Sequence, residues 1–172
     1  LTSLGDFDEA LRVFARAEMR AAAHAFPVLQ AGVEDAVAFL RLARGQYGEA
    51  LAGFEGARRR YEQLDMVQEA AVAEKQLADT YLELRLLPEA LALLDTSLAH
   101  FRALDRPDEQ ALALAQRGRV LALLGKAEAA ESFVQAARLF AAQGNAAGES
   151  TVLLARAELE LNAGEPGAAL DL

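Results

Sequence analysis

The stretch GQYGEAL at residues 45–51 decides the fold, because related stretches return along the chain at a nearly constant interval. The others read GDFDEAL at 5–11, RLLPEAL at 85–91, GKAEAA at 125–130 and GEPGAAL at 164–170. The aligned alanines are Ala10, Ala50, Ala90, Ala130 and Ala169, so three equal steps are followed by one that is shorter by a single position. A fixed period of about 20 to 50 residues is typical of a solenoid of repeated supersecondary units.

The segments between these stretches have helical hydrophobic spacing. Leu91, Leu94 and Leu98 form one apolar stripe, and no alternating β-branched run occurs in the sequence. Pro27 and Pro107 lie two periods apart, each at a predicted helix start, where proline is tolerated. The predicted first helices of the repeats span 27–44, 67–84, 107–124 and 147–163, and the second helices span 6–24, 47–63, 88–104 and 127–142.

We divide residues 1–172 into a single array of repeats. It comprises a partial unit 1–26, full units 27–66, 67–106 and 107–146, and a partial unit 147–172, in which a further helix is predicted from Pro166. Stable solenoids end in capping units with a polar outer face. Neither end shows one, so we expect the chain to be a fragment of a longer protein.

The repeat length has one irregularity. Ala90 and Ala130 are separated by the full period, but the step from Phe101 to Phe140 is shorter by a single position. The missing residue falls within the second helix if Ala130 is the equivalent of Ala90, and in the turn before it if Ala129 is.

The repeated residues resemble those of the tetratricopeptide repeat (TPR) family. Leu77, Ala78 and Tyr81 match its first-helix pattern, and Ala90 follows the turn as it does in the family. The small first-helix position reads Ala38, Ala78, Gly118 and Ala157. The period of 40 exceeds the family's usual length of about 34 residues and is similar to long repeats in bacterial sensor-regulator and signalling proteins. The resemblance implies an all-α, right-handed superhelical solenoid of antiparallel helix hairpins.

Composition argues against several kinds of partner. The chain has a net charge of −9 and a pI near 4.8, so it lacks the excess of basic residues that is typical of a nucleic-acid-binding protein. The one basic run, Arg58–Arg60, falls late in a predicted helix, where cations complement the helix dipole. No uncharged apolar stretch reaches the length of a membrane span, about 18 residues or more. The absence of cysteine favours a cytoplasmic location.

The sequence also lacks the motifs of catalysis. His24 and His100 are the only histidines, both near the ends of predicted helices, and no serine-centred elbow or cysteine nucleophile is present. Residues 118–126 superficially resemble a phosphate loop, but six residues separate the glycines, and Ala127 follows the lysine. We therefore predict that the chain is not an enzyme and binds no cofactor or metal.

The TPR resemblance implies a concave groove lined by the first helices. Carried over position by position, the groove residues are Asp35, Phe39, Lys75, Asp79, Leu82, Arg119, Leu154 and Glu158. Apolar residues beside Lys75 and Arg119 favour a helix or extended peptide of acidic or amphipathic character. The alternative is that the apolar residues among them, Phe39, Leu82 and Leu154, pack between consecutive units.

These observations favour a non-catalytic scaffold that binds a protein or peptide in the concave groove. The alternative hypothesis is a sensor or regulatory arm of a larger multidomain signalling or transcription-regulating protein. A third hypothesis is self-association through the uncapped ends, where apolar helix faces are left uncovered.

Overall fold

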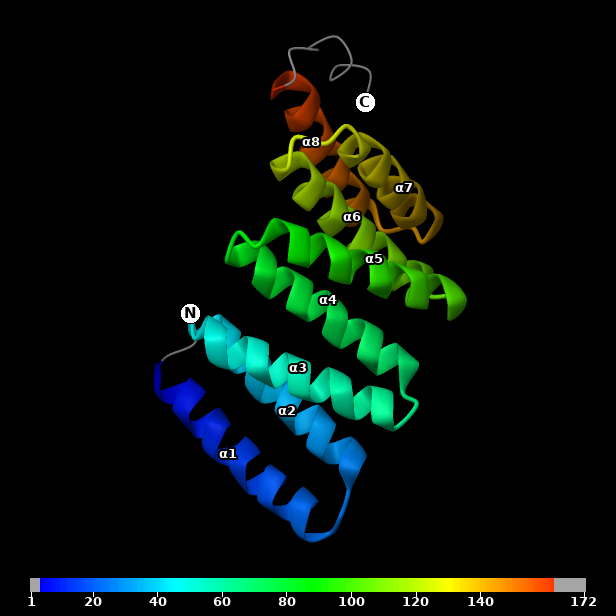
Figure 1. The fold of residues 1–172 in the computed structure, drawn as a ribbon. Coiled ribbons are helices and arrows are strands. Elements are labelled where there is room, and N and C mark those ends of the chain that lie inside the picture. The colour runs from blue at the N-terminus through cyan, green and yellow to red at the C-terminus, as the bar shows by residue number, and fades with distance from the viewer. Residues whose placement is uncertain (1–3, 163–172) are drawn as a thin grey trace. The chain divides into compact units, whose positions relative to one another are not determined.

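The computed structural model describes residues 4–162, and every regular element within that range is an α-helix (Figure 1). The helices are α1 (Leu4–Ala23), α2 (Pro27–Ala43), α3 (Tyr47–Gln63), α4 (Val67–Glu83), α5 (Leu87–Ala103), α6 (Pro107–Leu123), α7 (Glu128–Ala142) and α8 (Ala146–Asn162). The predicted all-α fold is confirmed, and all eight predicted helices in this range are found within two residues of their expected ends. The further helix predicted from Pro166 lies outside the described residues. The right-handed superhelical path stays a prediction.

Each connection between consecutive helices places one residue in the left-handed backbone region. These residues are Ala25, Gly45, Asp65, Arg85, Asp105, Gly125 and Gly144, with φ between 50° and 74°. They recur at equal steps of half a repeat, except that the last step is shorter by a single position. In six of the turns the backbone amide of the residue after the left-handed one donates to a carbonyl five residues back, as Gln46 does to Arg41 at 2.9 Å. This is the hydrogen bond of a Schellman motif, so the backbone itself closes these turns.

The structure settles where the missing residue falls. Ala129 is fully buried, as are Ala50 and Ala90, whereas Ala130 is partly exposed. The amide of Ala129 donates to the carbonyl of Lys126 three residues back, while Ala50 bonds four residues back. The shortening therefore lies in the turn before α7, which has 15 residues where α2 to α6 each have 17.

The described helices fall into two compact units, divided between Leu84 and Arg85. In the N-terminal unit α1 packs on α2, α2 on α3 and α3 on α4. The closest approach is between α2 and α3, where a Cβ added to Gly53 would lie 2.8 Å from the Cβ of Ala38. A small residue at both positions thus sets how near these two helices come.

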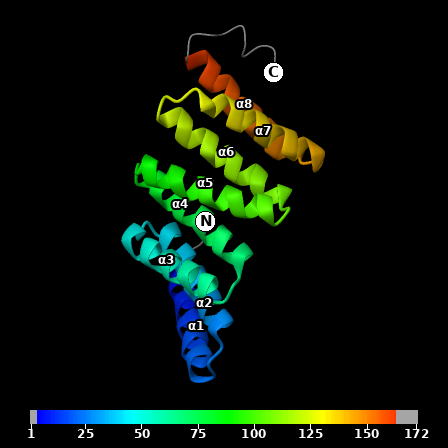
Figure 2. The same ribbon diagram turned by 45° about the vertical axis from the view of Figure 1, so that its right-hand side comes forward.

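The C-terminal unit contains α5 to α8, whose consecutive helices pack together while α6 also contacts α8 (Figure 2). Its core includes the fully buried side chains of Leu94, Phe101 and Leu121. The ring of Phe133 on α7 lies against Gly118 on α6, so closely that an added Cβ would be 2.6 Å from the Cε1 atom of the ring. Gly118 therefore leaves the space that this aromatic ring fills.

Gly118→Ala is expected to destabilise the chain, because the ring of Phe133 or the helix backbone must shift to admit the methyl group. Overpacking costs about 1–3 kcal/mol, and the higher helix propensity of alanine returns up to about 1 kcal/mol. We expect the free energy of unfolding to fall by about 1–2 kcal/mol in urea denaturation followed by circular dichroism.

Gly48→Ala is the matched control, because nothing lies within 4 Å of a Cβ at this helical glycine. Its stability should equal or exceed that of the wild type. Equal effects of the two substitutions would show that the contact with Phe133 does not limit the residue at position 118.

Candidate functional site

Asp35, the first predicted groove residue, lies on α2 and is linked to α4. Its carboxylate accepts a hydrogen bond from the side chain of Gln76. Its Oδ1 atom and the Oε1 atom of Gln76 are buried and have no hydrogen-bond partner within the described part of the chain. A buried carboxylate oxygen without a donor makes the charged form costly, because the lost hydration is not replaced.

Burial raises the pKa of Asp35 from 3.8 to about 6, and the hydrogen bond from Gln76 opposes only part of that rise. Burial also raises the pKa of Tyr61 to about 12, with smaller contributions from the negative charges of Asp35 and Glu69. The Asp35 carboxyl is therefore placed among polar groups of the helix packing, between α2 and α4, rather than on an open surface.

The other predicted groove residues of the N-terminal unit differ in exposure. Phe39 on α2 is 57% exposed. Lys75 and Asp79, on α4, are both partly exposed. Leu82 departs from the expected groove position because its side chain is only 6% exposed, so the packing alternative describes it better.

In the C-terminal unit the structure brings three predicted residues together. Arg119 on α6 and Leu154 and Glu158 on α8 line one hollow of about 660 Å³. All three are exposed, and Leu154 reaches 62%. This cluster combines apolar surface with both signs of charge on two neighbouring first helices.

Sequence reasoning missed several residues that line the same hollow. They are Arg85, Ala122, Leu123, Phe133, Ala155 and Leu159. Leu123 is 49% exposed and widens the apolar surface beside Leu154. The sequence could have indicated Ala122 as a groove residue, because it occupies the repeat position held by Leu42 and Leu82 in the two preceding units.

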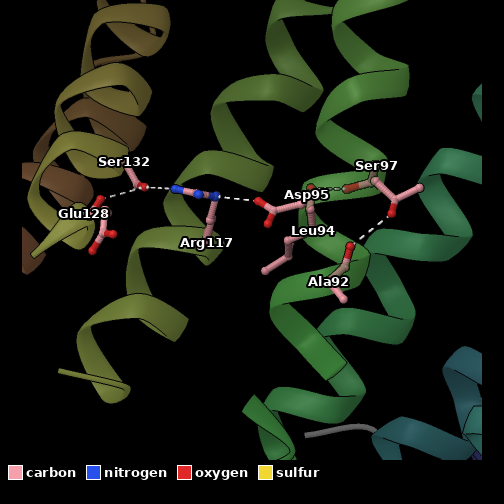
Figure 3. A network of polar contacts seen from close by, with 8 residues as sticks. Ala92, Leu94, Asp95, Ser97, Arg117, Glu128 and Ser132 are labelled. Carbon is pink, nitrogen blue, oxygen red and sulfur yellow. Dashed lines mark hydrogen bonds and ion pairs between the residues drawn. The ribbon is translucent and has the colours of Figure 1, made fainter. Parts of the chain in front are cut away.

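A second polar arrangement in this unit holds helices together. Arg117 on α6 lies between two partners (Figure 3), donating from Nε to Asp95 Oδ1 at 2.7 Å and from Nη1 to Ser132 Oγ at 2.8 Å. Ser132 in turn donates to the backbone carbonyl of Glu128 at 3.0 Å. A nucleophilic serine needs a neighbouring base to take its proton. Ser132 instead accepts from a guanidinium, so the arrangement joins α5, α6 and α7 structurally.

Residues 4–162 also bear on metal binding and on membrane insertion. This range contains no group of three or more His, Cys, Asp or Glu side chains arranged to hold a metal ion. Likewise, none of its helices combines the length and apolar character needed to cross a membrane.

Helix hairpins repeated at a fixed interval, joined by turns with one left-handed residue each, define a helical-repeat protein. The repeats are TPR-like, as the following comparisons with solved structures show. No protein-family model and no curated protein sequence matches the chain.

The crystal structure of BtubC (BKLC) from P. vanneervenii matches with a TM-score of 0.87 and 20% identity, over 97% of this chain and 70% of that one. A putative kinesin light chain from Podospora anserina, with nearly identical TPR-like repeats, matches with a TM-score of 0.80 and 17% identity, over 97% and 83% of the two chains. A Rap protein complexed with competence and sporulation factor matches with a TM-score of 0.79 and 20% identity, over 97% of this chain and 47% of that one. At these identities the similarity establishes the fold.

Asp35→Asn is expected to raise stability at neutral pH. The pKa of Asp35 is higher in the folded chain than in the unfolded one, so the folded state binds more protons between about pH 4 and pH 6. The contribution of Asp35 is thus most favourable below pH 4 and is lost as the pH rises through 6. After allowance for solvent around this partly exposed group, the variant should gain about 1 kcal/mol at pH 7.

The measurement is urea unfolding of both proteins across this pH range. The gain should shrink toward pH 4, where wild-type Asp35 is largely protonated in the folded state and begins to be protonated in the unfolded one. A difference that stays constant with pH would show that the carboxyl of Asp35 titrates normally.

Proposed function

We propose that the chain is a non-catalytic scaffold that binds a protein or peptide through the surfaces of its first helices. The observation that carries this proposal is the hollow between α6 and α8, where Leu154, Arg119 and Glu158 remain exposed. Apolar side chains gathered at a concave surface, with charged groups beside them, are typical of interaction sites.

The structural similarity supports this proposal. One matching Rap protein is complexed with competence and sporulation factor, so a protein that contains a similar helical array forms a complex with another molecule. The contacts of Ser132 support a structural role for this serine rather than a catalytic one. A cytoplasmic location, expected from the cysteine-free sequence, is part of the same proposal.

The second candidate function is a sensor or regulatory arm within a larger protein. This chain spans 46% of apo RapI and 47% of the Rap protein in the complex, so less than half of each of those chains corresponds to it. An arm of this kind would transmit ligand binding to the remainder of its protein.

The two functions are distinguished by affinity capture from native lysate with mass spectrometry. The wild type is compared with the double charge reversal Lys75→Glu plus Arg119→Glu. We expect at least one partner of the wild type to be lost by this variant, because both changes add repulsion on the first helices. The control is Lys126→Glu plus Arg138→Glu, which makes the same change in net charge at exposed residues outside the hollow.

A partner kept by all three proteins would place binding away from the first helices. No captured partner would reject the scaffold in favour of the regulatory arm. Sedimentation of the purified chain tests self-association, which a monomer at all concentrations would exclude.

A further inference from the structure

The hollow between α6 and α8 exists because two repeat positions carry shortened side chains. Ala122 on α6 stands where the preceding units have Leu42 and Leu82. Ala155 on α8 stands where the preceding units have Gln76 and Gln116, once the shortened turn before α7 is allowed for. Both alanines line the hollow, so the space corresponds to side-chain atoms that Leu42 and Leu82, or Gln76 and Gln116, supply in other repeats, although unit 27–66 also has an alanine, Ala36, at the second position.

The surface around the two alanines is apolar. Leu123 on α6 and Leu154 on α8 are 49% and 62% exposed, and Leu159 and Phe133 line the same space. A single exposed leucine is ordinary on a protein surface. Two that face one hollow from neighbouring helices form a patch into which an apolar side chain from another molecule can be buried.

The charged residues that line the hollow indicate which polar group of a ligand would bind beside that apolar side chain. Arg119 and Arg85 both line it, and neither forms an ion pair with another described residue. By contrast, Arg117 pairs with Asp95 in the same unit. In a chain of net charge −9, two guanidinium groups that have no carboxylate partner among residues 4–162 and lie beside an apolar patch complement a ligand that supplies a carboxylate.

We infer that this hollow binds a short peptide segment that carries a leucine-sized apolar side chain and, within about one turn, a carboxylate. The apolar side chain occupies the space left by Ala122 and Ala155, against Leu123 and Leu154. The carboxylate pairs with Arg119. This inference rests on the proposed function and names the chemistry of its partner; Glu158, on the opposite wall, disfavours a second carboxylate on that side of the segment.

The test is selection of a displayed random-peptide library on the full chain, followed by fluorescence anisotropy with synthetic copies of the enriched peptides. We expect these peptides to share an apolar residue and a nearby Asp or Glu. Arg119→Glu should weaken their binding about tenfold or more by replacing attraction with repulsion. Changing the peptide carboxylate to lysine should recover binding to this variant.

Ala122→Leu tests the space without changing charge. It should fold normally because Leu82 occupies the equivalent position in the preceding unit, and it should reduce binding by filling the hollow. Ala155→Gln, which restores the residue found at position 116, is a second filling variant. Arg138→Glu is the control, since this exposed arginine on α7 lies outside the hollow and its reversal should leave affinity unchanged.

Enriched peptides that lack carboxylates, or that bind Arg119→Glu and both filling variants as tightly as the wild type, would overturn the inference and leave the scaffold function standing. Failure to enrich any peptide, while lysate partners are still captured, would also overturn the inference alone. Failure of both experiments would reject the scaffold function as well.

Discussion

Close approach of paired helices at a small residue is the contact on which the rest of each unit depends. Ala38 and Gly53 leave no room for another carbon between α2 and α3, and Gly118 accommodates the ring of Phe133 between α6 and α7. Both contacts use the first-helix position at which the repeat carries a small side chain. Because dispersion forces fall off steeply with distance, this proximity makes the hairpin a well-packed element instead of two loosely associated helices.

The small side chains at these helix contacts also explain which surface of a unit remains available for binding. A hairpin held by small residues along its seam does not need every large apolar side chain for its own core. Leu154 and Leu123 therefore stay outside the packing, while Phe101, Phe133 and Phe140 are buried. Where a repeat also shortens the side chain at a first-helix position, as at Ala122, the outer surface becomes concave.

The periodic features could be predicted from the sequence, because every repeat carries a similar pattern of apolar, small and turn residues. Helix ends followed from Pro27 and Pro107 and from the recurring turns, and only the placement of the missing residue required the structure. The candidate site was harder to predict, because the repeat register identifies equivalent positions but not how exposed each side chain is. Asp35 and Phe39 lie one turn apart on α2, yet one has a buried oxygen and the other is largely exposed. Those differences arise from neighbouring helices, which a single periodic pattern does not specify.

The backbone-closed turns have a consequence for how such sequences diverge. A Schellman hydrogen bond joins main-chain atoms, so the identity of the turn side chain affects its cost but not its geometry. Alanine, aspartate, arginine and glycine all occupy the left-handed position in this one chain. Substitutions can accumulate at these turns without changing the path of the backbone. This tolerance is consistent with the comparison with apo RapI, whose fold matches with a TM-score of 0.87 at only 13% sequence identity.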